Sequence, residues 1–437
     1  MMGANVMEQK AVKYTNFRWL VLIGGMLMTT LSMMTGMTIA PLIGVIAKDL
    51  GVDIGTASFG IMGVNMFTTA IGVVIMGYLV DKAGLFKVML GSMVLLLVTH
   101  LLYPVMGHGY AGVVFLRILT ALGGAVGLIL LGPIVAQWFP ENERGTAMGV
   151  SAIGMFGVIG GFTLGPAVVE WAGSWQAGLA WISVIIAVGI VYMVCIMIGG
   201  RNIQPPNLVA EKKAEHPAYE GSFFKLIARN PAFWLGLAVM AFSNWSNNAF
   251  NDLSPGYLAV DPPAGVGYGP QMAGQLSSGG WIGMMAGMIA GGIMIDRVFK
   301  GRSGLMVMLG FVFNLIFYNG ILLQPIYSQP AILSGWLLVS GFVNPFTAIG
   351  NMYFAIKSFS PSVMGKIMAS WTFIGNIAGS VGVMAGSYAL HATGTYHTSF
   401  MIVSVVCILG FVAALVSKDR RTELEMRAEG KLACRNG

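Results

Sequence analysis

Two charged side chains lie inside long apolar runs of the sequence, and both could bind a charged small molecule. Arg117 lies in FLRILTALGGAVG, where its guanidinium could hold a carboxylate through two parallel hydrogen bonds. It could instead donate to backbone carbonyls of neighbouring helices. Asp252 is the only carboxylate well inside such a run, and it could take up a proton in a low-dielectric cavity.

Asp252 also belongs to a polar stripe. Counting from Asn244, the residues Asn248, Asn251, Asp252 and Pro255 follow at offsets that place them on one face of a helix. A polar stripe that faced lipid would be unfavourable, so this face should point into a helix bundle or a cavity. Pro255 and the glycine after it should break the helix and form a hinge. Hydrogen bonding between helices is the alternative role of the stripe.

Single polar or aromatic side chains lie near the middle of three other apolar runs. These further candidate substrate-binding residues are Asn65, Trp281 and Asn376. Helix packing is an alternative role for each, because asparagines often join helices through hydrogen bonds. The ionisable groups in the apolar runs are scattered and give no convergent set of nucleophile, base or metal ligands. The sequence therefore predicts a binding protein and not an enzyme.

The composition indicates what must position these residues. The chain has 437 residues, of which 56% are hydrophobic and only 9% charged, with a mean hydropathy of +0.77. A soluble domain averages about 25% charged residues, so this is a membrane protein that crosses the bilayer many times. The runs are continuously apolar and do not alternate, which predicts helices and excludes a β-barrel. The three cysteines are far apart and predict neither a disulfide nor a metal site; we expect no cofactor and no nucleic-acid partner.

The apolar runs number twelve. The predicted spans are 18–46, 57–80, 87–107, 111–137, 145–170, 176–199, 231–258, 271–295, 304–325, 331–356, 366–391 and 397–417. If the N-terminus is cytoplasmic, all of the 24 Lys and Arg residues except Lys48 and Arg117 fall at cytoplasmic ends, as basic residues do in membrane proteins. Both termini should therefore lie in the cytoplasm.

The polar stretch Pro205–Gly221 divides the spans into six and six. The predicted regions are a cytoplasmic arm (1–17), an N-terminal six-helix bundle (18–200), a cytoplasmic linker (201–230), a C-terminal six-helix bundle (231–417) and a cytoplasmic tail (418–437). GYLVDKAGLFK in the first bundle has a counterpart in GGIMIDRVFKGR in the second. Repeats at half-chain spacing are typical of secondary transporters built from two bundles, with the substrate site between them.

The turn after the second span resembles the signature of the major facilitator superfamily. The matching residues are Gly77, Leu79, Asp81, Lys82 and Gly84, and a looser copy at 292–302 contains Asp296 and Arg297. WFPENERGTAMG before the fifth span is similar to the organic-anion and monocarboxylate branches of that superfamily. The resemblance implies twelve helices in two pseudo-symmetric bundles that carry substrate by alternating access.

The resemblance also implies a role for the turn itself. Asp81 would dock against the start of the eleventh span and near Arg144, and so hold the cytoplasmic mouth shut when the protein opens outward. A helix N-terminus stabilises a nearby carboxylate in such an arrangement. Alternatively, Asp81, Lys82 and their neighbours are solvated charges that only fix the topology.

These features predict a secondary active transporter for a small organic anion of the carboxylate type, coupled to protons as a symporter. We expect it in a bacterial inner membrane, surrounded by lipid, as a monomer. A proton-coupled drug or metabolite efflux antiporter is the alternative. Exporters of cationic drugs usually carry an acidic group in the first half of the cavity, and no Asp or Glu lies deep in the first six spans.

Overall fold

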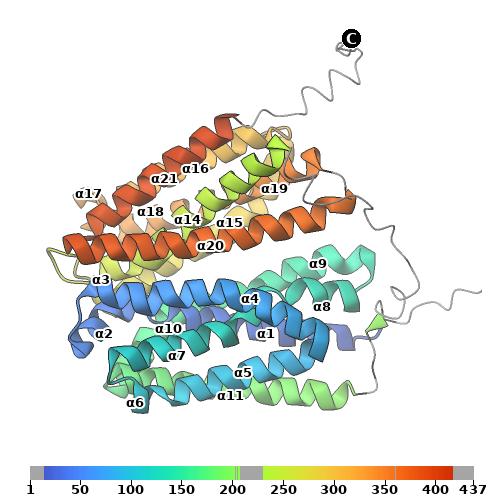
Figure 1. Ribbon diagram of the computed structural model, residues 1–437, viewed down its shortest axis with the longest axis horizontal. Helices are drawn as coiled ribbons and strands as arrows, with labels where there is room; N and C mark the ends of the chain where they lie inside the picture. The colour runs from blue at the N-terminus through green and yellow to red at the C-terminus, as the bar shows by residue number, and fades with distance from the viewer. Residues whose placement is uncertain (1–13, 202, 204, 207–229, 360, 417–437) are drawn as a thin grey trace, which may run out of the picture.

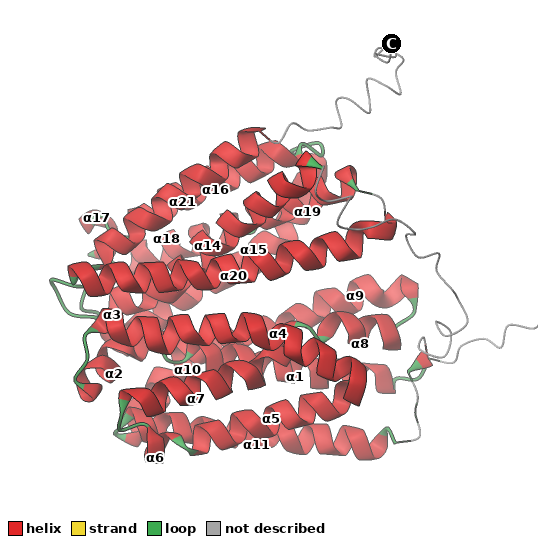
Figure 2. Cartoon of the chain, viewed as in Figure 1, coloured by secondary structure: helices red, strands yellow, loops and turns green. Residues whose placement is uncertain are grey.

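The computed structural model describes residues 14–201, 203, 205–206, 230–359 and 361–416, and the statements below concern this part of the chain. Throughout it the secondary structure is helical, without a strand (Figures 1 and 2). Most of the predicted arm, most of the predicted linker and the whole predicted tail lie outside the described residues.

The helices follow the predicted apolar runs. Those of the first half are α1 (Phe17–Met37), η1 (Ala40–Leu42), α2 (Ile43–Leu50), α3 (Ile54–Ala57), η2 (Ser58–Gly63), α4 (Val64–Ala83), α5 (Leu85–Leu101), α6 (Tyr103–Met106), α7 (Tyr110–Gly124), η3 (Ala125–Leu128), α8 (Leu131–Trp138), α9 (Glu141–Ser151), η4 (Ala152–Met155), α10 (Phe156–Ala172) and α11 (Trp175–Gly199). Those of the second half are α14 (Pro231–Ala259), α15 (Gly269–Arg297), α16 (Ser303–Gly320), α17 (Gln324–Tyr327), α18 (Pro330–Val343), α19 (Phe346–Ser358), α20 (Pro361–Thr393) and α21 (Tyr396–Val416). Several predicted spans are built from two or three consecutive helices.

Ten helical stretches of the described residues are long and apolar enough to cross a bilayer. Two predicted spans are not among these ten. The helix α5 has 17 residues and is followed directly by the short α6, whereas α14 has 29 residues but carries the asparagine stripe. Both occupy the predicted places of the third and seventh spans. The prediction of an all-helical membrane protein is therefore confirmed, and ten of the twelve predicted spans are long and apolar enough to cross a bilayer.

The two halves of the chain lie side by side, with the first half below and the second above in Figure 1. Each half has its own apolar core. Leu22 and Ile186 are fully buried in the first half, and Phe311 and Phe400 are buried in the second. This arrangement follows from the sequence. The six apolar helices of each half pack against one another and against the other half, and so form a core in each half.

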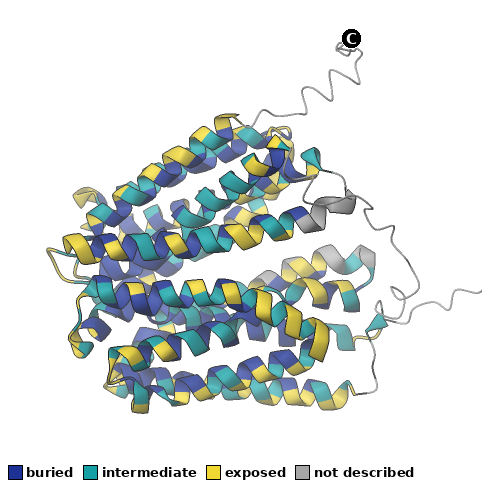
Figure 3. Ribbon diagram, viewed as in Figure 1, coloured by how far each residue is buried: buried dark blue, intermediate teal, exposed yellow. Residues whose placement is uncertain are grey.

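Apolar side chains cover the outside of the bundle as well. On α11, Val184, Val188 and Val191 follow one another at helical spacing and are 51%, 63% and 62% exposed. Figure 3 shows such exposed positions along the outer helices. A soluble protein would rarely expose so continuous an apolar surface, so this face fits contact with lipid.

Small residues allow close packing of helices where apolar burial alone gives little attraction in lipid. The contact of α15 with α18 is an example. A Cβ atom added at Gly283 would lie 1.9 Å from the carbonyl oxygen of Leu338, and one at Gly341 would lie 1.8 Å from that of Gly280. Only glycine fits at these two positions.

The halves are joined firmly at one end, which we call the Asp53 end. There α20 packs against α3 and η2, and the Ser58 and Ser387 hydroxyls lie 2.7 Å apart. The opposite end, which we call the Asp81 end, contains the turn between α4 and α5. From the Asp53 end to the Asp81 end, α4 and α20 diverge (Figure 1).

Candidate functional site

A central cavity of about 910 Å³, including the part open to solvent, lies between the two halves. It is lined by Ser32, Met33, Gly36, Met37, Asn65, Met66, Thr69, Ala70, Thr120, Ala121, Gly124, Leu128, Asn244, Asn248, Trp281, Asn376 and Ser380. Five of the seven predicted substrate-binding residues are among them, namely Asn65, Asn244, Asn248, Trp281 and Asn376. The first part of the polar stripe of α14, Asn244 and Asn248, thus faces the cavity, whereas Asn251, Asp252 and Pro255 do not line it.

The polar lining consists of amides and hydroxyls, and it includes no charged side chain. Asn65 of α4 donates from Nδ2 to the backbone carbonyl of Arg117 at 2.9 Å, and Asn244 of α14 donates to Met240 at 3.0 Å. The Thr69 hydroxyl donates to a backbone carbonyl of its own helix. Each amide keeps an oxygen and a second N–H for a ligand. The cavity can therefore both donate to and accept from a polar molecule.

Glycines of α20 make room for the asparagines of α14. A Cβ atom at Gly379 would lie 2.1 Å from Nδ2 of Asn248, and one at Gly375 would lie 2.8 Å from Nδ2 of Asn244. Both asparagine amides thus lie against bare backbone of α20. Larger residues at the two glycines would displace the amides that line the cavity.

Arg117 does not line the cavity. Its side chain is 1% exposed, and its guanidinium donates to three backbone carbonyls: Ile61 at 2.9 Å, Gly36 at 2.9 Å and Thr35 at 3.2 Å. Two of these carbonyls belong to the last turn of α1, where the helix itself provides no donors. A cation at a helix C-terminus is also favoured by the helix dipole. In this conformation Arg117 has the structural role that was the alternative to binding a carboxylate.

Asp252 lies near Arg117 but in the other half. Its side chain is 5% exposed, and neither carboxyl oxygen forms a hydrogen bond with any described group. The two side chains are close enough to interact electrostatically. Asp252 is not among the residues that line the cavity.

The predicted break at Pro255 is wrong. The helix α14 continues through Pro255 to Ala259. Proline removes only the hydrogen bond to the Asn251 carbonyl, and the segment Leu253–Ala259 is buried throughout, so packing holds the helix together.

The predicted latch residues lie at the Asp81 end, where no ion pair between described side chains joins the halves. The side chains at 361–366, near the start of the eleventh predicted span, lie outside the described part of the structure. Asp81 and Lys82 are exposed at the end of α4, and Asp81 forms no ion pair with any described side chain. Asp296 and Arg297 are exposed at the end of α15. The side chain of Arg144 lies outside the described part of the structure.

The two glycines of the signature have local roles. Gly84 adopts a φ of +90° between α4 and α5, a conformation that residues with a Cβ atom rarely adopt. An added Cβ atom at Gly77 would lie 3.9 Å from Ile129, the residue that follows η3. Gly84 is thus required by the turn, whereas Gly77 has room for a larger side chain.

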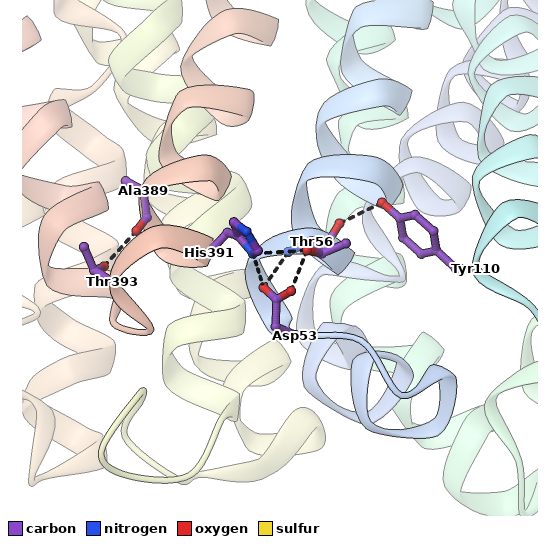
Figure 4. Close-up of polar contacts among 6 residues, drawn as sticks. All are labelled: Asp53, Thr56, Tyr110, Ala389, His391 and Thr393. Atoms are coloured by element: carbon purple, nitrogen blue, oxygen red, sulfur yellow. Dashed lines mark hydrogen bonds and ion pairs between the residues drawn. The ribbon is translucent and has the colours of Figure 1, made fainter.

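Sequence reasoning did not identify the polar contact that closes the Asp53 end. Nδ1 of His391 in α20 lies 2.9 Å from Oδ1 of Asp53 and 3.2 Å from Oγ1 of Thr56 (Figure 4). Asp53 also caps α3 by accepting from the backbone N–H of Thr56 at 2.9 Å. Partial burial raises the pKa of Asp53, but the hydrogen bonds from Thr56 and His391 together outweigh this effect and lower the pKa to about 2. Asp53 and Thr56 have the spacing of a helix cap, but no local signal pairs them with His391.

A second, outer cleft opens at this contact. It has a volume of about 1300 Å³, including open solvent, and lies between α2 and α3 of the first half and the ends of α14 and α20. Lys48, Asp53, Asp261 and His391 are among its lining residues. The contact between Asp53 and His391 thus lies at the surface of the molecule, beside this cleft.

Similar proteins are transporters. Over 148 residues, the chain is 32% identical to a protein of Pseudomonas putida described as a probable galactarate/D-glucarate transporter; the match covers 32% of this chain and 31% of that relative. Over 337 residues it is 22% identical to a hexuronate transporter of Bacillus subtilis, with 73% of this chain and 77% of the relative covered. The model of the Major Facilitator Superfamily matches residues 25–383. That match covers most of the chain, which therefore belongs to the Major Facilitator Superfamily.

Proposed function

We propose that the protein is a secondary active transporter for a small polyhydroxylated carboxylate, such as a sugar acid. The observation that carries this proposal is the central cavity, which lies between the halves and is lined by amides and hydroxyls from both. The named substrates of the relatives, galactarate, D-glucarate and hexuronates, are sugar acids and belong to this chemical class.

The lining is complementary to such a molecule. Each hydroxyl of a sugar acid both donates and accepts, and so does each asparagine amide. Asn65 approaches from the first half, and Asn248 and Asn376 from the second, so that substrate contacts would draw the halves together. The indole of Trp281 provides an apolar surface for the carbon chain. The positive charge of Arg117, buried at the C-terminal turn of α1, would attract the carboxylate without touching it.

Alternating access would proceed between two closures. In this structure the Asp53 end is closed by Asp53, His391 and the paired serines. We assign the Asp81 end to the cytoplasm, in agreement with the distribution of Lys and Arg. In the opposite state the Asp81 latch would close this end while the Asp53 end opens. We infer that proton uptake from outside drives the cycle as symport.

We place the protein in a bacterial inner membrane with both termini in the cytoplasm. Both walls of the cavity come from one chain. The site therefore does not require a second copy, and we expect a monomer to suffice for transport.

Uptake into proteoliposomes tests the proposal. Purified protein should take up labelled glucuronate in exchange for unlabelled glucuronate inside, and external galactarate and glucarate should compete. Glucose, which lacks the carboxylate, and acetate, which lacks the hydroxyls, should compete poorly. Protein-free liposomes give the background. Transport of a lipophilic cation such as tetraphenylphosphonium, with no transport of any sugar acid, would contradict this function and support the efflux antiporter.

A further inference from the structure

The most unusual group outside the cavity lining is the carboxyl of Asp252. It is 5% exposed, and neither of its oxygens forms a hydrogen bond within the described structure. An ionised carboxylate in such a position has lost its water without gaining a donor, which is strongly unfavourable. The environment therefore fits the neutral acid, with a proton on one of its two oxygens.

The opposite charge that acts on Asp252 is in the other half of the protein. Asp252 of α14 and Arg117 of α7 interact electrostatically across the interface. Three carbonyls accept hydrogen bonds from the guanidinium. Carbonyl groups are dipoles without a net charge, so the guanidinium of Arg117 keeps its net charge of +1. The buried core thus carries a positive charge when Asp252 is protonated and no net charge when Asp252 is ionised.

The position of Asp252 along α14 places it between two solvent-accessible spaces. Asn248, four residues earlier, lines the central cavity, and Ala259, seven residues later on the same face, lines the outer cleft. Asp252 thus lies in the closed layer that separates them. Opening of the Asp53 end would bring outer water to this carboxyl.

From this arrangement we propose that Asp252 is the proton-binding site of the transporter. We further propose that the charge of Arg117 couples the two binding events, so that protonation of Asp252 favours binding of the anion. The inference rests on the proposed function. A proton from outer water forms an O–H bond with one oxygen of Asp252, which leaves Arg117 uncompensated and favours entry of an anion. When the substrate leaves on the Asp81 side, the same O–H bond breaks and the proton passes to water. An ionised Asp252 would neutralise Arg117 and disfavour the anion.

Other titratable groups do not replace Asp252 in this role. The helix α14 packs against α2, α15, α19, α20, α21 and η1. Tyr396 of α21 is the titratable group on these elements that interacts with Asp252. The charged or titratable side chains on the others lie towards the ends of the bundle, for example Lys48 of α2, Asp296 of α15, Lys357 of α19 and His391 of α20.

The test uses the full chain in proteoliposomes and separates exchange from accumulation. Exchange of glucuronate at equal pH needs no net proton movement, whereas accumulation against a gradient does. With one proton per anion, a gradient of one pH unit, acidic on the side of the Asp53 end, supports up to about tenfold accumulation. Asp252→Asn should retain exchange and lose this accumulation. Asp252→Glu should retain both, because the group can still bind a proton. Glu170→Gln, a change at an exposed carboxylate at the end of α10, should behave as wild type.

The outcomes distinguish the two proposals. If the wild type does not exchange any sugar acid, the proposed function fails and this inference fails with it. If wild-type exchange is intact but Asp252→Asn still accumulates glucuronate as the wild type does, only the assignment of Asp252 is wrong. If Asp252→Asn does not fold, Asp252→Glu decides: loss of gradient-driven accumulation in a well-folded, exchanging Asp252→Glu protein contradicts the assignment.

Discussion

Asp53 and His391 are separated by 338 residues in the sequence, and their side chains meet at 2.9 Å across the two halves of the protein (Figure 4). Because a carboxylate can only accept, Nδ1 of His391 must donate in this contact. Thr56 is held in the same cluster, and the Tyr110 hydroxyl donates to its carbonyl at 2.9 Å. The contact therefore connects α3, α7 and α20 where the Asp53 end is closed.

Asp53→Asn should favour opening of the Asp53 end. Both side chains are about half exposed, so we expect the contact to contribute about 0.2–1 kcal/mol, which shifts the equilibrium between closed and open by up to about fivefold. Spin labels at the exposed Val45 and Ala392, on a background without the native cysteines, would measure the change as a larger population of long distances. Asp261→Asn, an exposed acid at the same end, is the control. An unchanged distance distribution in Asp53→Asn would show that the contact does not hold the closure.

The same labels test the pH dependence of the closure. The pKa of Asp53 is lowered from an ordinary value of 3.8 to about 2 in the closed state. Because the closed state lowers the pKa of Asp53, the ionised carboxylate stabilises the closed state. This stabilisation is complete at pH values above the ordinary pKa and is lost as the pH falls through the lowered pKa. The contribution of Asp53 should thus be constant above about pH 4 and disappear between about pH 4 and 2. Loss of an Asp53-dependent difference already near pH 6 would contradict this.

Arg117→Lys should destabilise the protein more than it alters substrate recognition. Lysine cannot reach three carbonyls on two helices with the geometry of a guanidinium, and each buried carbonyl left without a donor costs about 1–3 kcal/mol. Thermal unfolding of the purified protein in detergent measures this. Arg201→Lys, at an exposed position after α11, is the matched control. A melting temperature equal to that of the wild type, combined with loss of substrate binding, would instead indicate direct contact with the carboxylate.

Asp81→Asn should lower transport without lowering expression. Asp81 is exposed and unpaired with described side chains in this conformation, so its removal should not weaken the structure seen here. The substitution should destabilise the opposite state, in which the Asp81 end is closed, and so slow the conversion of the protein to that state. Glucuronate exchange in proteoliposomes is the measurement. Turnover equal to that of the wild type would mean that Asp81 serves topology alone.

The sequence was sufficient to predict the fold because burial in lipid is a strong and local constraint. Each apolar run must form a helix, and the basic residues mark the ends of the runs. The helical face of Asn244 and Asn248 was predictable for the same reason: polar groups must avoid lipid. The continuity of α14 through Pro255 was not predictable, because it depends on packing around Leu253–Ala259 that the local sequence does not encode.

The roles of the charged residues depended on long-range contacts. From sequence, Arg117 could bind either a carboxylate or carbonyls, and the choice is set by the end of α1 and by the carbonyl of Ile61, far away in the chain. The partnership of Asp53 with His391 joins the two halves and has no periodic signal in either. In both cases the position of a charge can be read from the sequence, but its partner cannot.

Direct binding of a sugar acid to the purified protein tests the central claim, which is that both halves hold the substrate in the central cavity. Calorimetric titration of glucuronate should give a measurable affinity for the wild type. Asn65→Ala in the first half and Asn376→Ala in the second should each weaken it by about fivefold, the effect of one lost hydrogen bond of about 1 kcal/mol. Asn351→Ala, which removes a buried donor to the Gly236 carbonyl outside the cavity lining, should lower stability and leave the affinity unchanged. No binding by the wild type, or an affinity that neither cavity variant alters, would contradict the account.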